Sequence, residues 1–128
     1  MRDYQHYING RWTASTGSET IKVLNPATEE IISTVAVGTT EDVDNAVAAA
    51  KSAFEDWRAC PISVRIDYME KIYNEIEKNQ QLIADTIVAE LGASQTFAEN
   101  THATQPLKEM RATIDAVKEY EFEYFEDT

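Results

Sequence analysis

The stretch VLNPATEEII, residues 23–32, decides how the first part of the chain folds. Both of its ends are rich in β-forming residues, and it breaks at Asn25-Pro26, where proline has no N–H to donate to a sheet ladder. Asn and Pro are also typical residues of β-turns. The stretch therefore predicts a turn between two antiparallel strands, one ending at Leu24 and the other starting at Ile31.

A second turn signal lies upstream of this stretch. Asn9-Gly10 is flanked by Tyr7, Ile8 and Trp12, which are typical strand residues. The dipeptide Asn-Gly favours the positive φ angles of a two-residue type I′ turn. The sequence therefore predicts a β-hairpin at the beginning of the chain.

Downstream of the two turns, the apolar residues recur every three or four positions, which is the period of a helix. Thr39 and Asp42 can cap a first helix that ends before Cys60, and Pro61 can open a second. Gly92 is suited to end a third helix, and Pro106 should kink or restart a fourth. We expect an α+β chain in which a hairpin region precedes about four helices.

Each expected helix has an apolar face, and the face of the first helix is expected to be buried. The faces are Val43, Ala46, Val47, Ala50, Phe54 and Trp57; Val64, Tyr68, Met69, Ile72, Tyr73 and Ile76; Leu82, Ile83, Ile87, Val88 and Leu91; and Leu107, Met110, Ile114 and Val117. Aromatic and acidic residues then alternate over Tyr120 to Glu126 as in a strand. A strand with no partner is unusual at a terminus, so we expect the native protein to continue.

Composition excludes several classes of function. The 128 residues carry a formal net charge of -12, which would repel phosphate backbones and anionic lipid headgroups. We expect no nucleic-acid partner and no membrane partner, and we interpret the acidic excess as a plain solvated surface. A single cysteine, no signal sequence and no apolar stretch of membrane-spanning length favour a cytoplasmic protein.

No catalytic or cofactor-binding residue is predicted. Cys60 stands near a helix start, which could lower the pKa of a thiol, but no base is close to it in sequence. His6 and His102 are isolated and are interpreted as ordinary surface or packing residues. The four glycines do not form a phosphate-binding signature. A minimal hydrolase that uses Cys60 is therefore the least supported alternative.

Several segments together resemble the amino-terminal region of the aldehyde dehydrogenase superfamily. They are Tyr7–Trp12, Val23–Glu29, Val35–Trp57, Arg65 and Glu90-Leu91-Gly92. The resemblance implies that residues 1–128 form the amino-terminal part of an NAD(P)-binding domain. The parent fold would be α/β, and its catalytic domain and most of its dinucleotide-binding sheet would be absent from the chain.

The resemblance also implies a reaction, the oxidation of an aldehyde to a carboxylic acid with NAD or NADP. A cysteine thiolate and a glutamate carry out this chemistry in the family, and the chain has neither motif. The chain alone is expected to be inactive and to bind no cofactor, while its parent is expected to be a homo-oligomer. Ala93-Ser94 follows Gly92 where many members have a lysine, which leaves the aldehyde substrate open.

A structural monovalent cation is implied by the same resemblance. Its ligands would be backbone oxygens of Val23 and Leu24 and the carboxylate of Glu90, which are oxygen donors that suit a hard cation. The alternative is that Glu90 only ends a helix at the surface.

A second interpretation of the whole chain is a stand-alone acidic α+β interaction module without enzymatic activity. The two interpretations differ in where the apolar faces lie, because a complete module should bury them within itself.

Overall fold

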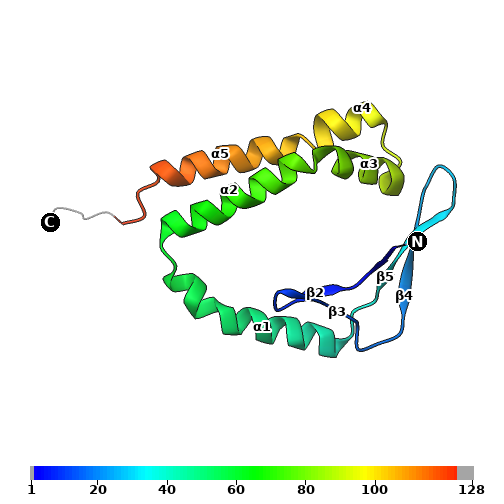
Figure 1. The fold of residues 1–128 in the computed structure, drawn as a ribbon, viewed down its shortest axis with the longest axis horizontal. Helices are drawn as coiled ribbons and strands as arrows, with labels where there is room; N and C mark the ends of the chain where they lie inside the picture. Colours follow the sequence, from blue (N-terminus) through cyan, green and yellow to red (C-terminus); the bar gives the residue numbers. More distant parts are fainter. Residues whose placement is uncertain (1, 124–128) are drawn as a thin grey trace. The chain divides into compact units, whose positions relative to one another are not determined.

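The computed structural model describes residues 2–123, which divide into two compact units (Figure 1). Unit 1 contains the residues up to Cys60 together with Ile87–Ala93, and unit 2 contains Pro61–Thr86 and the described residues from Ser94 onward. The strands are β1 (Arg2–Tyr4), β2 (His6–Ile8), β3 (Arg11–Thr13), β4 (Thr20–Leu24) and β5 (Ile31–Ala36). The helices are α1 (Thr40–Ala59), α2 (Ile62–Lys78), α3 (Gln80–Leu91), α4 (Gln95–Phe97), the π-helix η1 (Ala98–His102) and α5 (Gln105–Glu119). The expected α+β order of a hairpin region and then four long helices is confirmed.

Strands β4 and β5 are antiparallel, as the Asn25-Pro26 signal predicts, and β1 pairs with β5 in the parallel direction. The Asn25 side-chain oxygen accepts hydrogen bonds from the backbone N–H groups of Ala27 at 2.9 Å and Thr28 at 3.3 Å, which holds the turn closed. Val23 lies opposite Ser33 and Leu24 opposite Ile31, so β5 has one extra residue next to the turn.

The predicted hairpin is also confirmed. Strands β2 and β3 are antiparallel and place Tyr7 opposite Trp12, whose rings meet edge to face at 5.2 Å between centroids. Asn9 and Gly10 both have positive φ angles, 53° and 75°, as a type I′ turn requires.

Helix α1 begins and ends where the sequence predicts, but its predicted burial is wrong. Val43 is 58% exposed and Phe54 is 56% exposed, and from Glu41 to Ala59 only Asp42 is buried and Ala49 half-buried. The physical reason is that α1 approaches strand β2 and the loop before β4 through its first turns. Periodicity shows that the helix has an apolar face, but unit 1 supplies nothing that covers it.

Unit 2 contains a small core of its own, formed largely where α5 packs along α2. Ile114 is 0% exposed and Leu107 is 7% exposed, so the predicted apolar face of α5 is confirmed. Pro106 lies in the first turn of α5, which begins after a two-residue turn that follows the π-helical segment, and the predicted restart of the helix at this proline is confirmed. The predicted face of α2 is only partly covered, because Tyr68 and Ile72 are exposed.

Charged side chains reinforce the pairing of α2 and α5. The Glu70 carboxylate accepts hydrogen bonds from Lys118 Nζ at 2.8 Å and from Arg111 Nη1 at 3.0 Å. Chiefly the Lys118 ammonium, and then the Arg111 guanidinium, hold the pKa of Glu70 below its usual range. The Arg111 guanidinium also lies 4.1 Å from the centre of the Tyr73 ring, a cation–π distance.

The end of the described chain is irregular. Tyr120 to Glu123 do not form a strand, and the rings of Tyr120 and Phe122 meet edge to face at 4.8 Å. The remainder of the predicted alternating segment, up to Glu126, lies outside the described residues. None of the helices in residues 2–123 is both long and apolar enough to cross a membrane.

Gly92 ends α3 in the left-handed conformation, with φ 73°, and packs against the ring of Pro26. A Cβ at this position would lie 2.8 Å from Pro26 Cγ. We predict that Gly92→Ala lowers the free energy of unfolding of unit 1 by about 2–4 kcal/mol in urea denaturation, from backbone strain and the clash together.

Gly10 provides the matched control, because its φ is 75° and a Cβ there would meet nothing within 4 Å. Gly10→Ala should lower the free energy of unfolding only by the backbone strain, about 1–2 kcal/mol. Equal losses in the two variants would show that the contact with Pro26 contributes nothing.

Candidate functional site

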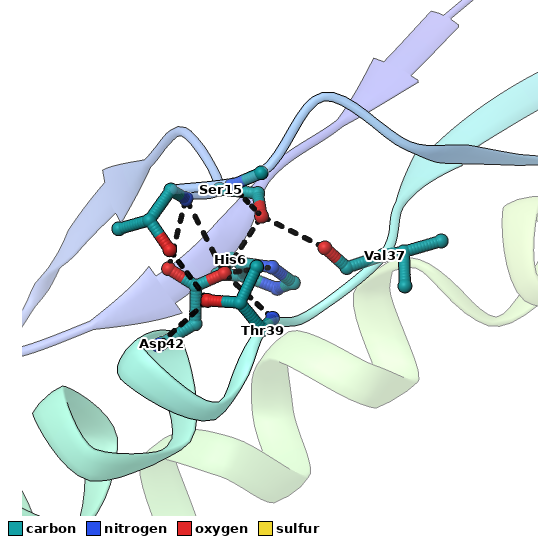
Figure 2. A network of polar contacts seen from close by, with 7 residues as sticks. His6, Ser15, Val37, Thr39 and Asp42 are labelled. Atoms are coloured by element: carbon teal, nitrogen blue, oxygen red, sulfur yellow. Dashed lines mark hydrogen bonds and ion pairs between the residues drawn. The ribbon is translucent and has the colours of Figure 1, made fainter.

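The carboxylate of Asp42, in the first turn of α1, accepts several hydrogen bonds within unit 1 (Figure 2). Asp42 is 5% exposed. Its oxygens accept hydrogen bonds from Ser15 Oγ at 2.6 Å, from the Thr16 backbone N–H at 3.0 Å and from the Thr39 backbone N–H at 3.0 Å. One carboxylate thus joins the loop before β4 to the start of the helix.

The surrounding hydroxyl groups complete this arrangement. Thr39 Oγ1 accepts a hydrogen bond from the Asp42 backbone N–H at 3.2 Å, so Thr39 and Asp42 form a reciprocal capping box. Thr39 Oγ1 also hydrogen-bonds to the hydroxyl of Thr16. Ser15 Oγ accepts from the Gly17 N–H at 3.1 Å and lies 2.7 Å from the Val37 carbonyl oxygen, which follows β5.

These donors stabilise the ionised form of Asp42. The hydrogen bond from Ser15 and then that from the Thr39 backbone hold the pKa of this carboxyl far below its ordinary value of 3.8, against the opposing effect of burial. His6 Nε2 lies 3.7 Å from Asp42 Oδ2 and is buried without a hydrogen-bond partner among the described residues. An ion pair forms there only when the imidazole is protonated.

The Asp42 site is structural in character. A carboxylate with so low a pKa is a poor general base near neutral pH, and backbone groups occupy much of its accepting capacity. A groove of about 350 Å³ lies next to it, between the β2–β3 hairpin and α1, with Arg11 and Asn45 in its lining. The lining of this groove contains no cysteine and no serine that could act as a nucleophile.

The other sequence candidates lie apart from Asp42. Cys60 caps the end of α1 as a free, half-buried thiol, and no histidine or carboxylate of residues 2–123 hydrogen-bonds to it. The ring of His102 meets that of Phe97 edge to face at 4.9 Å, which confirms its interpretation as a packing residue. Sequence reasoning missed the position of His6 next to Asp42.

The proposed cation ligands come from two elements. Val23 and Leu24 end β4, and Glu90 is exposed on the last turn of α3. The contact between Gly92 and Pro26 brings that helix end against the turn that follows Leu24. In the described part of the chain, no three His, Cys, Asp or Glu side chains converge as a metal site.

The sequence profile of the aldehyde dehydrogenase family matches residues 12–127, nearly the whole chain. The chain belongs to the aldehyde dehydrogenase family. It is 44% identical over 124 residues to a Staphylococcus aureus protein assigned as an aldehyde dehydrogenase and 39% identical to one from Staphylococcus saprophyticus. Each match covers 96% of the chain but only 26% of the relative, so the chain spans about a quarter of the length of these aldehyde dehydrogenases.

Solved aldehyde dehydrogenases show the same fold. The Bartonella henselae enzyme superposes with a TM-score of 0.92 at 34% identity, over 95% of the chain and 26% of that enzyme. A mutant of aldehyde dehydrogenase C from Pseudomonas syringae, in complex with NAD+ and octanal, superposes with a TM-score of 0.93 at 34% identity. That match covers 97% of the chain and 26% of the mutant enzyme.

The polar network predicts a pH dependence of stability. Folding lowers the pKa of Asp42, so its ionised carboxylate stabilises the folded state at pH values above the ordinary pKa of 3.8. This stabilisation is lost as the pH falls below 3.8. Asp42→Asn places an amide NH₂ among N–H and O–H donors, and we predict a thermal midpoint several degrees lower near neutral pH.

Asp44→Asn is the control, because it removes the same charge from an exposed position of α1. This variant should keep the thermal midpoint and the acid sensitivity of the parent chain, whereas Asp42→Asn should lose part of that sensitivity. Thermal scans by circular dichroism between neutral pH and pH about 2 measure both. Identical curves for the two variants would rule out the role given to Asp42.

Proposed function

We propose that the chain is the amino-terminal part of the NAD(P)-binding domain of an NAD(P)-dependent aldehyde dehydrogenase, and that it supplies framework rather than catalytic groups. Two observations together support the proposal. The chain matches about a quarter of the length of its relatives, and apolar faces of its helices are exposed. A complete interaction module would cover such faces itself, so the exposed residues favour the enzyme interpretation over the module.

The proposed reaction of the whole enzyme is the oxidation of an aldehyde to a carboxylic acid. In the whole enzyme, a bound NAD or NADP would accept the hydride that the aldehyde loses, and water would supply the second oxygen of the acid. The complex of the related Pseudomonas syringae mutant with NAD+ and octanal supports this choice of cofactor and substrate class. We expect the whole enzyme to be a cytoplasmic homo-oligomer.

The contribution of this chain is positional. Asp42 fixes the first turn of α1 against the loop that follows the β2–β3 hairpin. Gly92 fixes the end of α3 against the Asn25-Pro26 turn. These two contacts fix the positions of loops and helix ends within unit 1. In this proposal the residues that react with the aldehyde belong to the rest of the enzyme.

A chimaeric enzyme tests the proposal. Residues 1–128 would replace the equivalent quarter of wild-type Pseudomonas syringae aldehyde dehydrogenase C, with octanal and NAD+ as substrates. We predict a kcat/KM within about 100-fold of the natural enzyme, because the framework matches but small displacements of the active site are costly.

The 128-residue chain alone is the control, and it should reduce no NAD+ in the same assay. A chimaera that is folded and soluble but has no dehydrogenase activity would contradict the proposal.

A structural monovalent cation at Val23, Leu24 and Glu90 is part of the same proposal. The donor set fits, because two peptide carbonyls and one carboxylate offer only oxygen, and the Gly92–Pro26 contact supports the approach of the two elements. In crystals of the chain soaked with rubidium, we predict an anomalous peak between these oxygens that disappears in Glu90→Gln. Absence of the peak in the parent chain would refute the site.

A further inference from the structure

The tip of the β2–β3 hairpin carries two groups that can react with each other. They are the side-chain amide of Asn9 and the backbone nitrogen of Gly10, and both residues are exposed. Within residues 2–123, neither the Asn9 amide nor the Gly10 N–H forms a hydrogen bond. A Cβ built on Gly10 would meet nothing within 4 Å, so the space around this nitrogen is open.

The reaction between these groups is deamidation. The Gly10 nitrogen attacks Asn9 Cγ and gives up its proton, the new N–C bond closes a succinimide ring, and the side-chain nitrogen leaves as ammonia. Water then opens the ring at either carbonyl carbon and leaves a carboxylate. The product is aspartate or isoaspartate, and in isoaspartate the main chain passes through the former side chain. No oxidant, reductant or cofactor takes part.

The other asparagines of the chain lack this combination. Asn25 is followed by Pro26, which has no N–H and cannot supply the attacking nitrogen. Each of the remaining asparagines is followed by a residue whose side chain hinders the attack, whereas Gly10 has none. These asparagines are Asn45, Asn74, Asn79 and Asn100.

The folded turn keeps the two reacting groups apart. Asn9 and Gly10 have φ angles of 53° and 75°, as in a type I′ turn, whose first central residue has a ψ angle of about 30°. At this ψ angle the nitrogen of the next residue lies anti to Cβ across the Cα–C bond, so the Gly10 nitrogen cannot reach Asn9 Cγ. Deamidation of Asn9 therefore requires the turn to open.

The β2–β3 hairpin is a weakly supported part of unit 1. Each strand has three residues, the two strands form a sheet of their own, and an isolated two-stranded hairpin is only marginally stable in water. Tyr7 and Trp12 are 63% and 64% exposed, so the face that carries their rings is largely uncovered. Support comes from Asp42, which holds the loop that directly follows β3 through Ser15 and Thr16.

We propose that Asn9 deamidates spontaneously when the β2–β3 hairpin opens, that the Asp42 contacts limit how often it opens, and that the isoaspartate product prevents it from closing again. Isoaspartate adds a methylene group to the main chain, so the two-residue turn that places Ile8 opposite Arg11 can no longer form. The inference goes beyond the proposed function and does not depend on it.

Peptide mapping by mass spectrometry tests the opening step on the 128-residue chain, incubated at neutral pH with and without concentrated urea. The turn is absent in urea, so the rate measured there is that of the open state. We expect Asn9 to deamidate about 10-fold more slowly in buffer than in urea, because the hairpin is only marginally stable. Equal rates would show that the turn gives no protection. No product in buffer, over the time that completes the reaction in urea, would show that the hairpin does not open.

Asp42→Asn and Asp44→Asn test the role of the Asp42 contacts. In buffer, Asp42→Asn should accelerate the deamidation of Asn9 by about 3-fold or more, because it weakens the hydrogen bonds that hold the loop after β3. Asp44→Asn removes the same charge from an exposed position and should leave the rate unchanged. In urea the parent chain and both variants should react equally fast. Equal rates of the two variants in buffer would refute the role given to Asp42.

Asn9→Asp is the control for the effect of the product. This variant carries the same new charge as the deamidated chain, and Asp-Gly also favours a type I′ turn. Chain that contains isoaspartate, purified by chromatography, should lose the hydrogen-exchange protection of residues 6–13 that Asn9→Asp retains. Equal protection in the two proteins would show that isoaspartate leaves the hairpin closed.

Discussion

The buried carboxylate of Asp42 is the interaction on which unit 1 depends. It gathers donors from the loop at Ser15 and Thr16 and from the backbone of Thr39, so the end of the hairpin region and the start of α1 share one acceptor. A buried charge is tolerable only when it is well solvated by such donors, and here the donors come from segments far apart in sequence. The loop, the end of β5 and the helix are therefore fixed together.

Most local elements of this fold could be predicted from the sequence, because each has a residue that selects its backbone conformation. Asn9-Gly10 supplies the positive φ angles of the hairpin, Thr39 and Asp42 supply the cap, and Gly92 supplies the helix end. The approach of Ser15 to Asp42 could not be predicted, since it joins residues 27 positions apart without a signal in either segment. The exposure of α1 could not be predicted from the sequence either, because periodicity identifies an apolar face but does not show what packs against it.

The two units differ in how complete their packing is. Unit 2 buries Ile114 and Leu107 in a hydrophobic core. Its Glu70 also forms ion pairs with Arg111 and Lys118. Unit 1 is held mainly by strand pairing and by the hydrogen bonds around Asp42, and its buried polar residues are Ser33 and Asp42. In the described residues, the buried apolar side chains thus belong to unit 2.

The contact of Gly92 with Pro26 has a consequence for how such sequences can change over evolution. The backbone at position 92 admits almost only glycine or asparagine, and the pyrrolidine ring of Pro26 removes the space that asparagine would need. Substitution at position 92 thus requires a smaller residue at position 26 first. Positions 92 and 26 should therefore covary among homologues, although they belong to different elements. Their covariation would show in which family members this turn and this helix end are in contact.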